Sequence, residues 1–313
     1  MLPLKRIGKN SLILFILIFF TTNCIAQAQS GFVKIKGGEL FYRIFGEGPP
    51  LVILNGGPGL ASDGYEHIAE ELSAIRKVIL FDQRGTGKSK VKLINEQSIT
   101  IHNMVNDLER LRKHLKIEKW DVLGQSFGGL YAMAYASRHH QYINKMILSS
   151  SAGIDTRQLD SMQDFDFPLM EDMTKEERAV LLQLKEEVNS KNPSEVKMKR
   201  YRSGLLARYY INKVESLPKA VEWFAYKSNP APGISTYVWR SLFTFNYKRR
   251  LKKIMTPVLI LHGVADFIQI NVPMKTHEIL QNSRLEFLDE SGHMLWLDQP
   301  KKVKSLIYAF LQN

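Results

Sequence analysis

The chain has 313 residues, which is enough for one large domain with an insertion or for two domains. Its 44% content of hydrophobic residues predicts a globular protein with a sizeable core. The formal net charge of +12 raises the question of a nucleic acid or an anionic membrane as partner, but the basic residues are scattered along the chain. We therefore expect no nucleic-acid partner, and we interpret the dense basic run at 248–253 as the solvated end of a helix.

Residues 1–28 have the pattern of a secretory signal peptide. Basic side chains over 5–9 precede an apolar run over 12–20, which is too short to span a bilayer as a helix. An Ala-Gln-Ala cleavage site follows at 26–28. We expect export to the periplasm or beyond, with no membrane span once the signal is removed. Two alternatives stay open, namely an uncleaved membrane anchor and lipid attachment at Cys24.

Cys24 is the only cysteine in the sequence. Removal of the signal would leave a mature protein without cysteine, which excludes disulfides and thiolate metal sites. No other cluster of residues has the spacing of metal ligands, so we expect neither a metal ion nor another cofactor.

Strand and helix patterns alternate up to residue 153, which predicts a parallel sheet with right-handed crossovers. Short, fully apolar runs in this part suit central strands that are buried on both faces. The expected elements are a hairpin over 31–45, strands over 51–54 and 78–81 with a helix over 65–76 between them, an amphipathic helix over 99–115, a strand over 120–125, a further helix, and a strand over 143–148.

The pattern changes after Gly153, because residues 154–250 show helical segments, one of them over about 235–250, and no clear strand. A helical block inserted between the strands of such a sheet predicts a cap over an active site. Alternation then resumes with a strand over 258–261, a helix over 273–282, a strand over 285–288 and a closing helix over 301–311. The expected domains are a core of 29–153 and 251–313 and a helical cap of 154–250.

Residues 124–128 (Gly-Gln-Ser-Phe-Gly) follow directly on a predicted strand. In this pattern the serine stands on a sharp strand-to-helix turn with its hydroxyl exposed. The flanking glycines fit because a Cβ atom would collide with neighbouring backbone in so tight a turn. Ser126 is therefore the candidate nucleophile.

A serine nucleophile needs a general base, usually a histidine that is oriented by a carboxylate. Asp266 lies just past the end of one predicted strand, and His293 lies in the loop after the next. Loops at the carboxyl ends of parallel strands assemble the site in such folds, so we predict that Ser126, Asp266 and His293 converge as a triad. Asp289 and Asp298 are weaker candidates for the acid. The other histidines are interpreted as structural or exposed.

Acyl transfer also needs donors for the oxyanion. We expect the backbone N–H groups of Phe127 and of Gly57, the latter in the loop at 55–59 (Asn-Gly-Gly-Pro-Gly). Residues 82–89 (Asp-Gln-Arg-Gly-Thr-Gly-Lys-Ser) lack the glycine spacing of a phosphate loop. They predict a structural loop at the rim of the site, with Asp82 and Arg84 in internal pairs.

Three of these motifs resemble the α/β-hydrolase superfamily and, within it, the prolyl iminopeptidases of serine peptidase family S33. Residues 55–59 are similar to that group's His-Gly-Gly-Pro-Gly, with Asn55 in place of the histidine. Residues 82–89 match its Asp-Gln-Arg-Gly-x-Gly-x-Ser, and 124–129 match its nucleophile elbow. The resemblance implies an α/β fold with a mostly parallel, eight-stranded sheet, flanking helices and an inserted helical cap.

The resemblance also implies a substrate class. Cap glutamates of that family bind the free amino terminus of a substrate, which nominates Glu222, with Glu186, Glu187 and Glu215 as competitors. The cap lacks the tryptophan-rich pattern of proline-specific members. We expect a secreted serine aminopeptidase that releases an N-terminal residue from short peptides through an acyl-enzyme. A carboxylesterase acting on a small ester is the alternative, and a non-catalytic binding protein is a third class that the complete triad disfavours.

Overall fold

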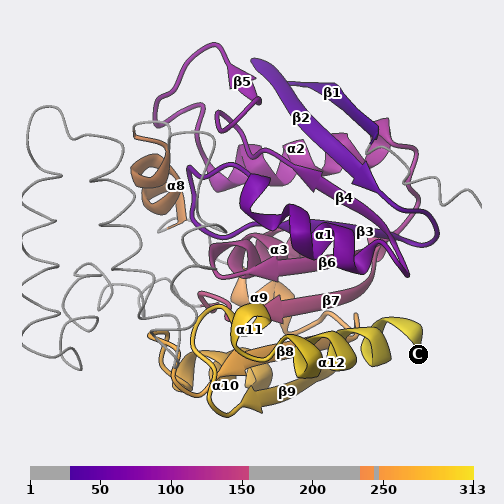
Figure 1. The fold of residues 1–313 in the computed structure, drawn as a ribbon. Coiled ribbons are helices and arrows are strands. Elements are labelled where there is room, and N and C mark those ends of the chain that lie inside the picture. Colours follow the sequence, from indigo (N-terminus) through magenta and orange to yellow (C-terminus); the bar gives the residue numbers. More distant parts are fainter. Residues whose placement is uncertain (1–28, 155–232, 243–246) are drawn as a thin grey trace, which may run out of the picture.

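The computed structural model describes residues 29–154, 233–242 and 247–313 (Figure 1). The expected signal peptide, Cys24, Glu222 and most of the expected cap lie outside these residues.

A single sheet forms the centre of the described fold (Figure 1). Its strands are β1 (Gln29–Ile35), β2 (Gly38–Phe45), β3 (Pro50–Leu54), β4 (Lys77–Phe81), β5 (Lys90–Val91), β6 (Trp120–Gln125), β7 (Ile143–Ser149), β8 (Val258–Gly263) and β9 (Ser283–Leu288). Eight of them follow the order β1-β2-β4-β3-β6-β7-β8-β9, and the two-residue β5 pairs with β2 outside this path. All neighbours along the order from β4 to β9 are parallel, which confirms the expected mostly parallel sheet. The short β5 adds a ninth strand to the eight that were expected.

Helices cover both faces of the sheet (Figure 1). They are α1 (Glu66–Leu72), α2 (Ile101–His114), α3 (Phe127–His139), α8 (Ile234–Leu242), α9 (Lys248–Leu251), α10 (Asn271–Ile279), α11 (Leu295–Asp298) and α12 (Pro300–Gln312), with 3-10 turns at Asp63–Tyr65 and His140–Tyr142. Successive side chains of a strand point to opposite faces. In β3, Val52 and Leu54 accordingly join the core under α2 and α3, and Leu51 and Ile53 join the core under α1 and α12.

Some predicted boundaries differ from the structure at helix ends. The helix expected over 65–76 ends at Leu72, after a 3-10 turn at Asp63–Tyr65. The helix expected over 273–282 ends at Ile279, because Leu280 already has extended backbone and β9 starts soon afterwards. The helix expected over about 235–250 is two helices in the described residues, α8 and α9. The four-residue α11 was not predicted, since so short a segment has no readable period.

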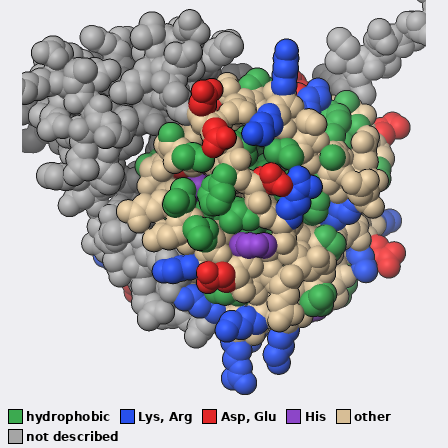
Figure 2. All heavy atoms as spheres, turned by 90° about the horizontal axis from the view of Figure 1, so that it is seen from below, with side chains coloured by type: hydrophobic (Ala, Val, Ile, Leu, Met, Phe, Trp, Pro, Cys, Tyr) green, Lys and Arg blue, Asp and Glu red, His purple; other side chains and the backbone are tan. Residues whose placement is uncertain are grey.

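Charged side chains of both signs lie on the face seen in Figure 2, interspersed with apolar ones. The basic run at 248–253 forms α9 and the turn after it, with buried Leu251 as its only anchor in the core. Of the described helices, none is both long enough and apolar enough to cross a membrane.

Candidate active site

Ser126 is the single residue between the end of β6 and the start of α3. Its backbone angles are φ 57° and ψ −122°, a conformation that L residues adopt only when the surroundings enforce it. Backbone hydrogen bonds hold the turn on both sides, from Ser126 N–H to Ser149 O (2.9 Å) and from Ala152 N–H to Ser126 O (3.0 Å). This is the strand–turn–helix context that the sequence motif requires.

Close packing of backbone explains the glycines beside the serine. A Cβ atom on Gly128 would lie 1.9 Å from the carbonyl oxygen of Leu54 in β3, and one on Gly124 would lie 2.3 Å from the carbonyl oxygen of Gly128. Real Cβ atoms do not approach backbone so closely, so any side chain at either position would open the elbow.

Asp266 and His293 lie together at the carboxyl ends of β8 and β9. The imidazole Nδ1 of His293 is 3.0 Å and 3.1 Å from the two carboxylate oxygens of Asp266. The carboxylate is completely buried, and it also accepts a 2.9 Å hydrogen bond from the N–H of Ile268. Burial alone would raise the pKa of Asp266, but the nearby His293 and these hydrogen bonds outweigh it and hold that pKa below its ordinary value. Asp266 is therefore ionised at neutral pH and holds the Nδ1 side of the imidazole.

The two weaker candidates for the acid lie elsewhere. The side chain of Asp289 is exposed. Asp298, in α11, accepts a 2.7 Å hydrogen bond from the backbone N–H of Gly292, the residue before His293. Asp298 thus holds the loop that carries the histidine, whereas Asp266 contacts the histidine ring itself.

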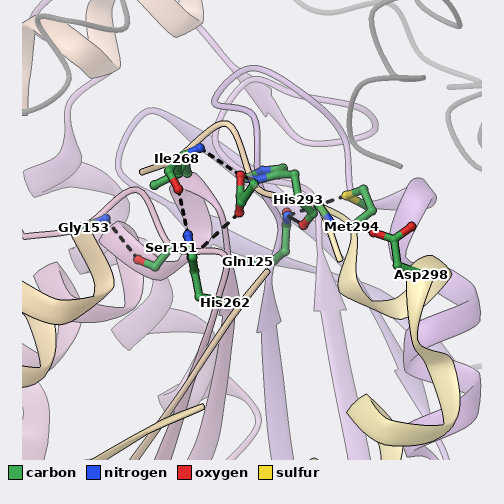
Figure 3. Close-up of polar contacts among 10 residues, drawn as sticks. Gln125, Ser151, Gly153, His262, Ile268, His293, Met294 and Asp298 are labelled. Carbon is green, nitrogen blue, oxygen red and sulfur yellow. Dashed lines mark hydrogen bonds and ion pairs between the residues drawn. The ribbon is translucent and has the colours of Figure 1, made fainter. Parts of the chain in front are cut away.

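A second histidine faces the same carboxylate, and the sequence did not identify it as part of the site (Figure 3). His262, in β8, is fully buried; its Nε2 donates a 2.7 Å hydrogen bond to the carbonyl oxygen of Ile268, and its Nδ1 is 3.8 Å from Asp266 Oδ2. Burial lowers the pKa of His262 despite the nearby carboxylate. The spacing of four residues between His262 and Asp266 across a strand end was the only signal in the sequence.

The loop expected to supply an oxyanion donor passes close to Ser126. A Cβ atom on Gly56 would lie 2.8 Å from the Cβ of Ser126. The N–H of Gly56 is already bound, since it donates a 3.0 Å hydrogen bond to the hydroxyl of Tyr65. The neighbouring Gly57 has φ +66°, in the left-handed region that favours glycine. Phe127 is the first residue of α3, where N–H groups have no acceptor within the helix.

Asn55, which departs from the family's histidine, braces this loop. It is fully buried, and its side-chain amide donates to the carbonyl oxygens of Gly56 (3.1 Å) and Leu60 (3.2 Å). Gln83 in turn donates to the backbone and side-chain oxygens of Asn55 at 2.9 Å and 3.1 Å. The asparagine therefore fixes the shape of the loop through side-chain contacts and leaves the backbone donors in place.

Residues 82–89 form a structural loop, as the sequence predicted. Arg84 makes a bidentate pair with Asp107 of α2 at 2.7 Å and 2.8 Å, and both side chains are buried. Asp82 accepts hydrogen bonds from the N–H groups of Ser62 (3.0 Å) and Lys88 (2.8 Å). Both side chains thus point inward and tie the loop to its neighbours.

One described helix of the expected cap lies against this site. In α8 the Trp239 ring meets the Phe127 ring edge-on, with 5.5 Å between centroids. At the start of α8 the backbone nitrogen of Ser235 lies near Gly59, at 3.5 Å from where a Cβ of that residue would be. Glu222, the candidate for binding a substrate amine, lies outside the described residues. Within the described ranges, no three His, Cys, Asp or Glu side chains gather as metal ligands would.

The Asp298→Asn variant tests the loop that carries His293. Burial raises the pKa of Asp298 from 3.8 to about 6, so the folded protein holds this proton more tightly than the unfolded chain does. The associated stability is complete below pH 3.8 and is lost as the pH rises through about 6. The amide side chain of the variant does not titrate. The variant should therefore gain stability relative to wild type as the pH rises from about 4 to about 7.

Urea unfolding at several pH values measures this difference. The Asp289→Asn variant removes an exposed carboxylate nearby and controls for the loss of one charge. A stability difference between Asp298→Asn and wild type that stays constant from pH 4 to pH 7 would contradict the prediction.

Comparisons with known proteins extend over most of the chain. A family model described as the alpha/beta hydrolase fold matches residues 49–300. The proline iminopeptidase of Lactobacillus helveticus (strain DPC 4571) is 29% identical over 298 residues, which cover 90% of this chain and 97% of that protein. An alpha/beta fold family hydrolase from Bacillus anthracis str. Sterne has a TM-score of 0.73 at 20% identity and covers 91% of this chain and 99% of its own. An esterase from Exiguobacterium antarcticum has a TM-score of 0.67 at 22% identity, with coverages of 91% and 100%.

Proposed function

Because this chain belongs to the alpha/beta hydrolase fold family, we propose that it is a serine hydrolase whose triad is Ser126, Asp266 and His293. The observation that carries the proposal is the contact of His293 Nδ1 with the buried Asp266 carboxylate, in a fold that places Ser126 on a strained elbow. An imidazole whose Nδ1–H is held by a carboxylate presents a basic Nε2 to a serine hydroxyl.

The proposed reaction begins when His293 takes the proton of the Ser126 hydroxyl and the oxygen attacks the substrate carbonyl carbon. The negative charge that develops on the carbonyl oxygen is stabilised by the N–H groups of Gly57 and Phe127. His293 then gives its proton to the leaving amine or alcohol, and an acyl-enzyme remains. Water attacks this ester with His293 again as general base. The bond between the acyl carbon and Ser126 Oγ then breaks, His293 returns the proton to the Ser126 oxygen, and the acid product leaves.

We propose an aminopeptidase of the proline iminopeptidase type, since relatives of that name align over 90% of the chain. A free N-terminal residue carries an ammonium group, which an acidic side chain must pair in a partly buried site. Glu222 is our candidate for that role. The second candidate function is a carboxylesterase, which the apolar surroundings of the elbow favour: Phe127 and Trp239 meet there and offer no charge to an amine.

Residues 1–28 support a further proposal, that the enzyme is exported and acts outside the cytoplasm. As an alternative, the exported protein is attached to a membrane, either by a lipid on Cys24 or by an uncleaved N-terminal anchor.

Turnover of matched substrates tests the proposed function. The purified full chain would be assayed on proline 4-nitroanilide, on the same compound with an acetylated amine, and on 4-nitrophenyl acetate and butyrate. An aminopeptidase hydrolyses the free-amine arylamide and discriminates strongly against the acetylated one. Ester turnover without turnover of proline, alanine or leucine arylamides would replace the peptidase proposal by the esterase. Lack of turnover on every substrate, together with no covalent labelling by a fluorophosphonate, would overturn the serine hydrolase.

A further inference from the structure

Two buried side chains link the loop around Gly57 to the loop that carries His293. The hydroxyl of Tyr65 accepts the hydrogen bond from Gly56 N–H at 3.0 Å and donates its own proton to Gln125 Oε1. The amide of Gln125 then reaches the backbone carbonyl of His293 at 3.4 Å and the sulfur of Met294 at 3.7 Å (Figure 3). We call this chain of contacts the Tyr65–Gln125 bridge.

The directions of these hydrogen bonds are fixed by chemistry. The carbonyl oxygen of His293 can only accept, so the NH₂ group of Gln125 faces it and Oε1 faces Tyr65, whose single proton is donated to Oε1. The carbonyl end of the amide is thereby committed to Tyr65, and its NH₂ end points to the histidine loop. Burial raises the pKa of Tyr65 far above its ordinary value, so the hydroxyl stays neutral and remains a donor at every relevant pH.

Both side chains are buried. Tyr65 is 5% exposed and Gln125 is 2% exposed. A Cβ on Gly56 would lie 2.5 Å from Gln125 Oε1, so the backbone of Gly56, next to Gly57, lies directly against the Gln125 amide. A rigid, fully satisfied polar network inside a low-dielectric core specifies one arrangement of the groups that it joins.

We propose that the Tyr65–Gln125 bridge sets the position of the loop around Gly57 (the oxyanion loop) relative to the loop that carries His293 (the histidine loop). This inference rests on the proposed serine hydrolase, because the loops it joins carry the proposed oxyanion donor Gly57 and the proposed base His293. Tyr65 and Gln125 are positioning residues, since the hydrogen bonds above join them to each other and to these two loops. The bridge positions a donor for the oxyanion, whose charge develops in the transition state. It should therefore stabilise the transition state and contribute little to substrate binding.

The Tyr65→Phe variant tests the bridge, because it removes one oxygen atom and keeps the ring. Loss of a complete oxyanion donor lowers kcat by about 100-fold to 1000-fold. A donor that is misplaced but present should matter less, so we expect kcat to fall by about 10-fold to 100-fold with KM within about twofold of wild type. Tyr308→Phe is the matched control. The Tyr308 hydroxyl donates to Glu71 O at 2.9 Å and contacts neither loop that the bridge joins, so its loss should leave kcat unchanged.

A double-mutant cycle separates the bridge from a general loss of packing. Gln125→Met keeps the length of the side chain and removes both polar ends. If the two residues act through one network, the Tyr65→Phe/Gln125→Met variant should lose no more than about the larger single loss, whereas independent losses multiply. Affinity for a boronic acid that mimics the tetrahedral intermediate should fall in step with kcat in each variant.

The outcomes distinguish this inference from the proposed function. Absence of fluorophosphonate labelling in wild type overturns the serine hydrolase and the bridge with it. The bridge alone is overturned if the wild type is active and labelled while a folded Tyr65→Phe variant keeps kcat within about twofold of the wild-type value. Multiplicative losses in the double variant, or a loss confined to KM, do the same. Thermal melting of each variant verifies the fold, and Gln125→Met decides the question if Tyr65→Phe does not fold.

Discussion

Replacement of Ser126 by alanine is expected to lower kcat by at least about 10⁴-fold on whichever substrate the wild type turns over. The hydroxyl is the only group that the proposed mechanism makes covalent, so no neighbour can replace it. Binding contacts remain, and KM should therefore change little. Labelling by a fluorophosphonate should be abolished in parallel, because the reagent needs the same nucleophile and the same base.

Ser137→Ala is the matched control for this result. Ser137 lies in the same helix, α3, and its buried hydroxyl donates a 2.7 Å hydrogen bond to the carbonyl oxygen of Ala134. Its removal takes away one serine hydroxyl in the same element without touching the elbow, and kcat should stay within about twofold of wild type. A Ser126→Ala protein that is folded and keeps more than about 1% of wild-type kcat would refute Ser126 as the nucleophile.

The elbow could be predicted from the sequence because its requirements are local. A short, mostly apolar strand, a serine with glycines two residues away on each side and a following helix are all encoded within residues 120–139. The strands of the sheet centre were predictable for the same reason, since runs such as Leu51–Leu54 are apolar at every position when both faces are covered. The two-residue β5, which is defined by its pairing with β2, and the four-residue α11 are too short to show a readable period in the sequence.

The support around the site could not be predicted, because it is made by contacts between distant segments. Tyr65 and Gln125 are 60 residues apart, and Gln125 and His293 are 168 residues apart. A tyrosine at the end of a 3-10 turn and a glutamine at a strand end have many ordinary roles, and no local pattern joins them. His262 was interpreted as structural or exposed for the same reason. Its place beside the Asp266 carboxylate depends on how β8 ends and on where Ile268 turns back.

The choice among acids shows how three-dimensional contacts resolve an ambiguity of sequence. Asp266, Asp289 and Asp298 all follow one of the last two strands in the sequence. Spacing alone therefore left Asp289 and Asp298 as weaker candidates for the acid of the triad. In the structure Asp266 meets the imidazole while Asp298 holds the backbone at Gly292. A carboxylate that is hydrogen-bonded to the imidazole ring orients the base, whereas one that is hydrogen-bonded to the loop backbone fixes only the position of the loop. The two aspartates should therefore differ in what their loss does to catalysis.

The Asp266→Asn variant is expected to lower kcat by about 10⁴-fold near neutral pH. In wild type, Asp266 Oδ1 accepts the N–H of Ile268 at 2.9 Å. An asparagine would keep its carbonyl oxygen on that donor, and its NH₂ group would then face His293 Nδ1. An NH₂ group can only donate, so His293 would have to accept at Nδ1 and carry its proton at Nε2. That tautomer has no lone pair for the Ser126 hydroxyl, and the base is lost without any change of shape.

The pH dependence of this variant identifies the cause, and Asp298→Asn supplies the comparison. Asp298 does not touch the ring, so its amide variant can still accept the N–H of Gly292 and should lose no more than about tenfold in kcat. Asp266→Asn should also lose the stabilisation that a buried carboxylate provides to the imidazolium formed during the reaction. His293 then becomes a poor general base. The residual rate should therefore rise towards high pH, where hydroxide can replace the base. The kcat of both variants would be measured from pH 5 to pH 10. Equal losses in the two variants would contradict the mechanism, and a larger loss in Asp298→Asn would assign the acid to Asp298.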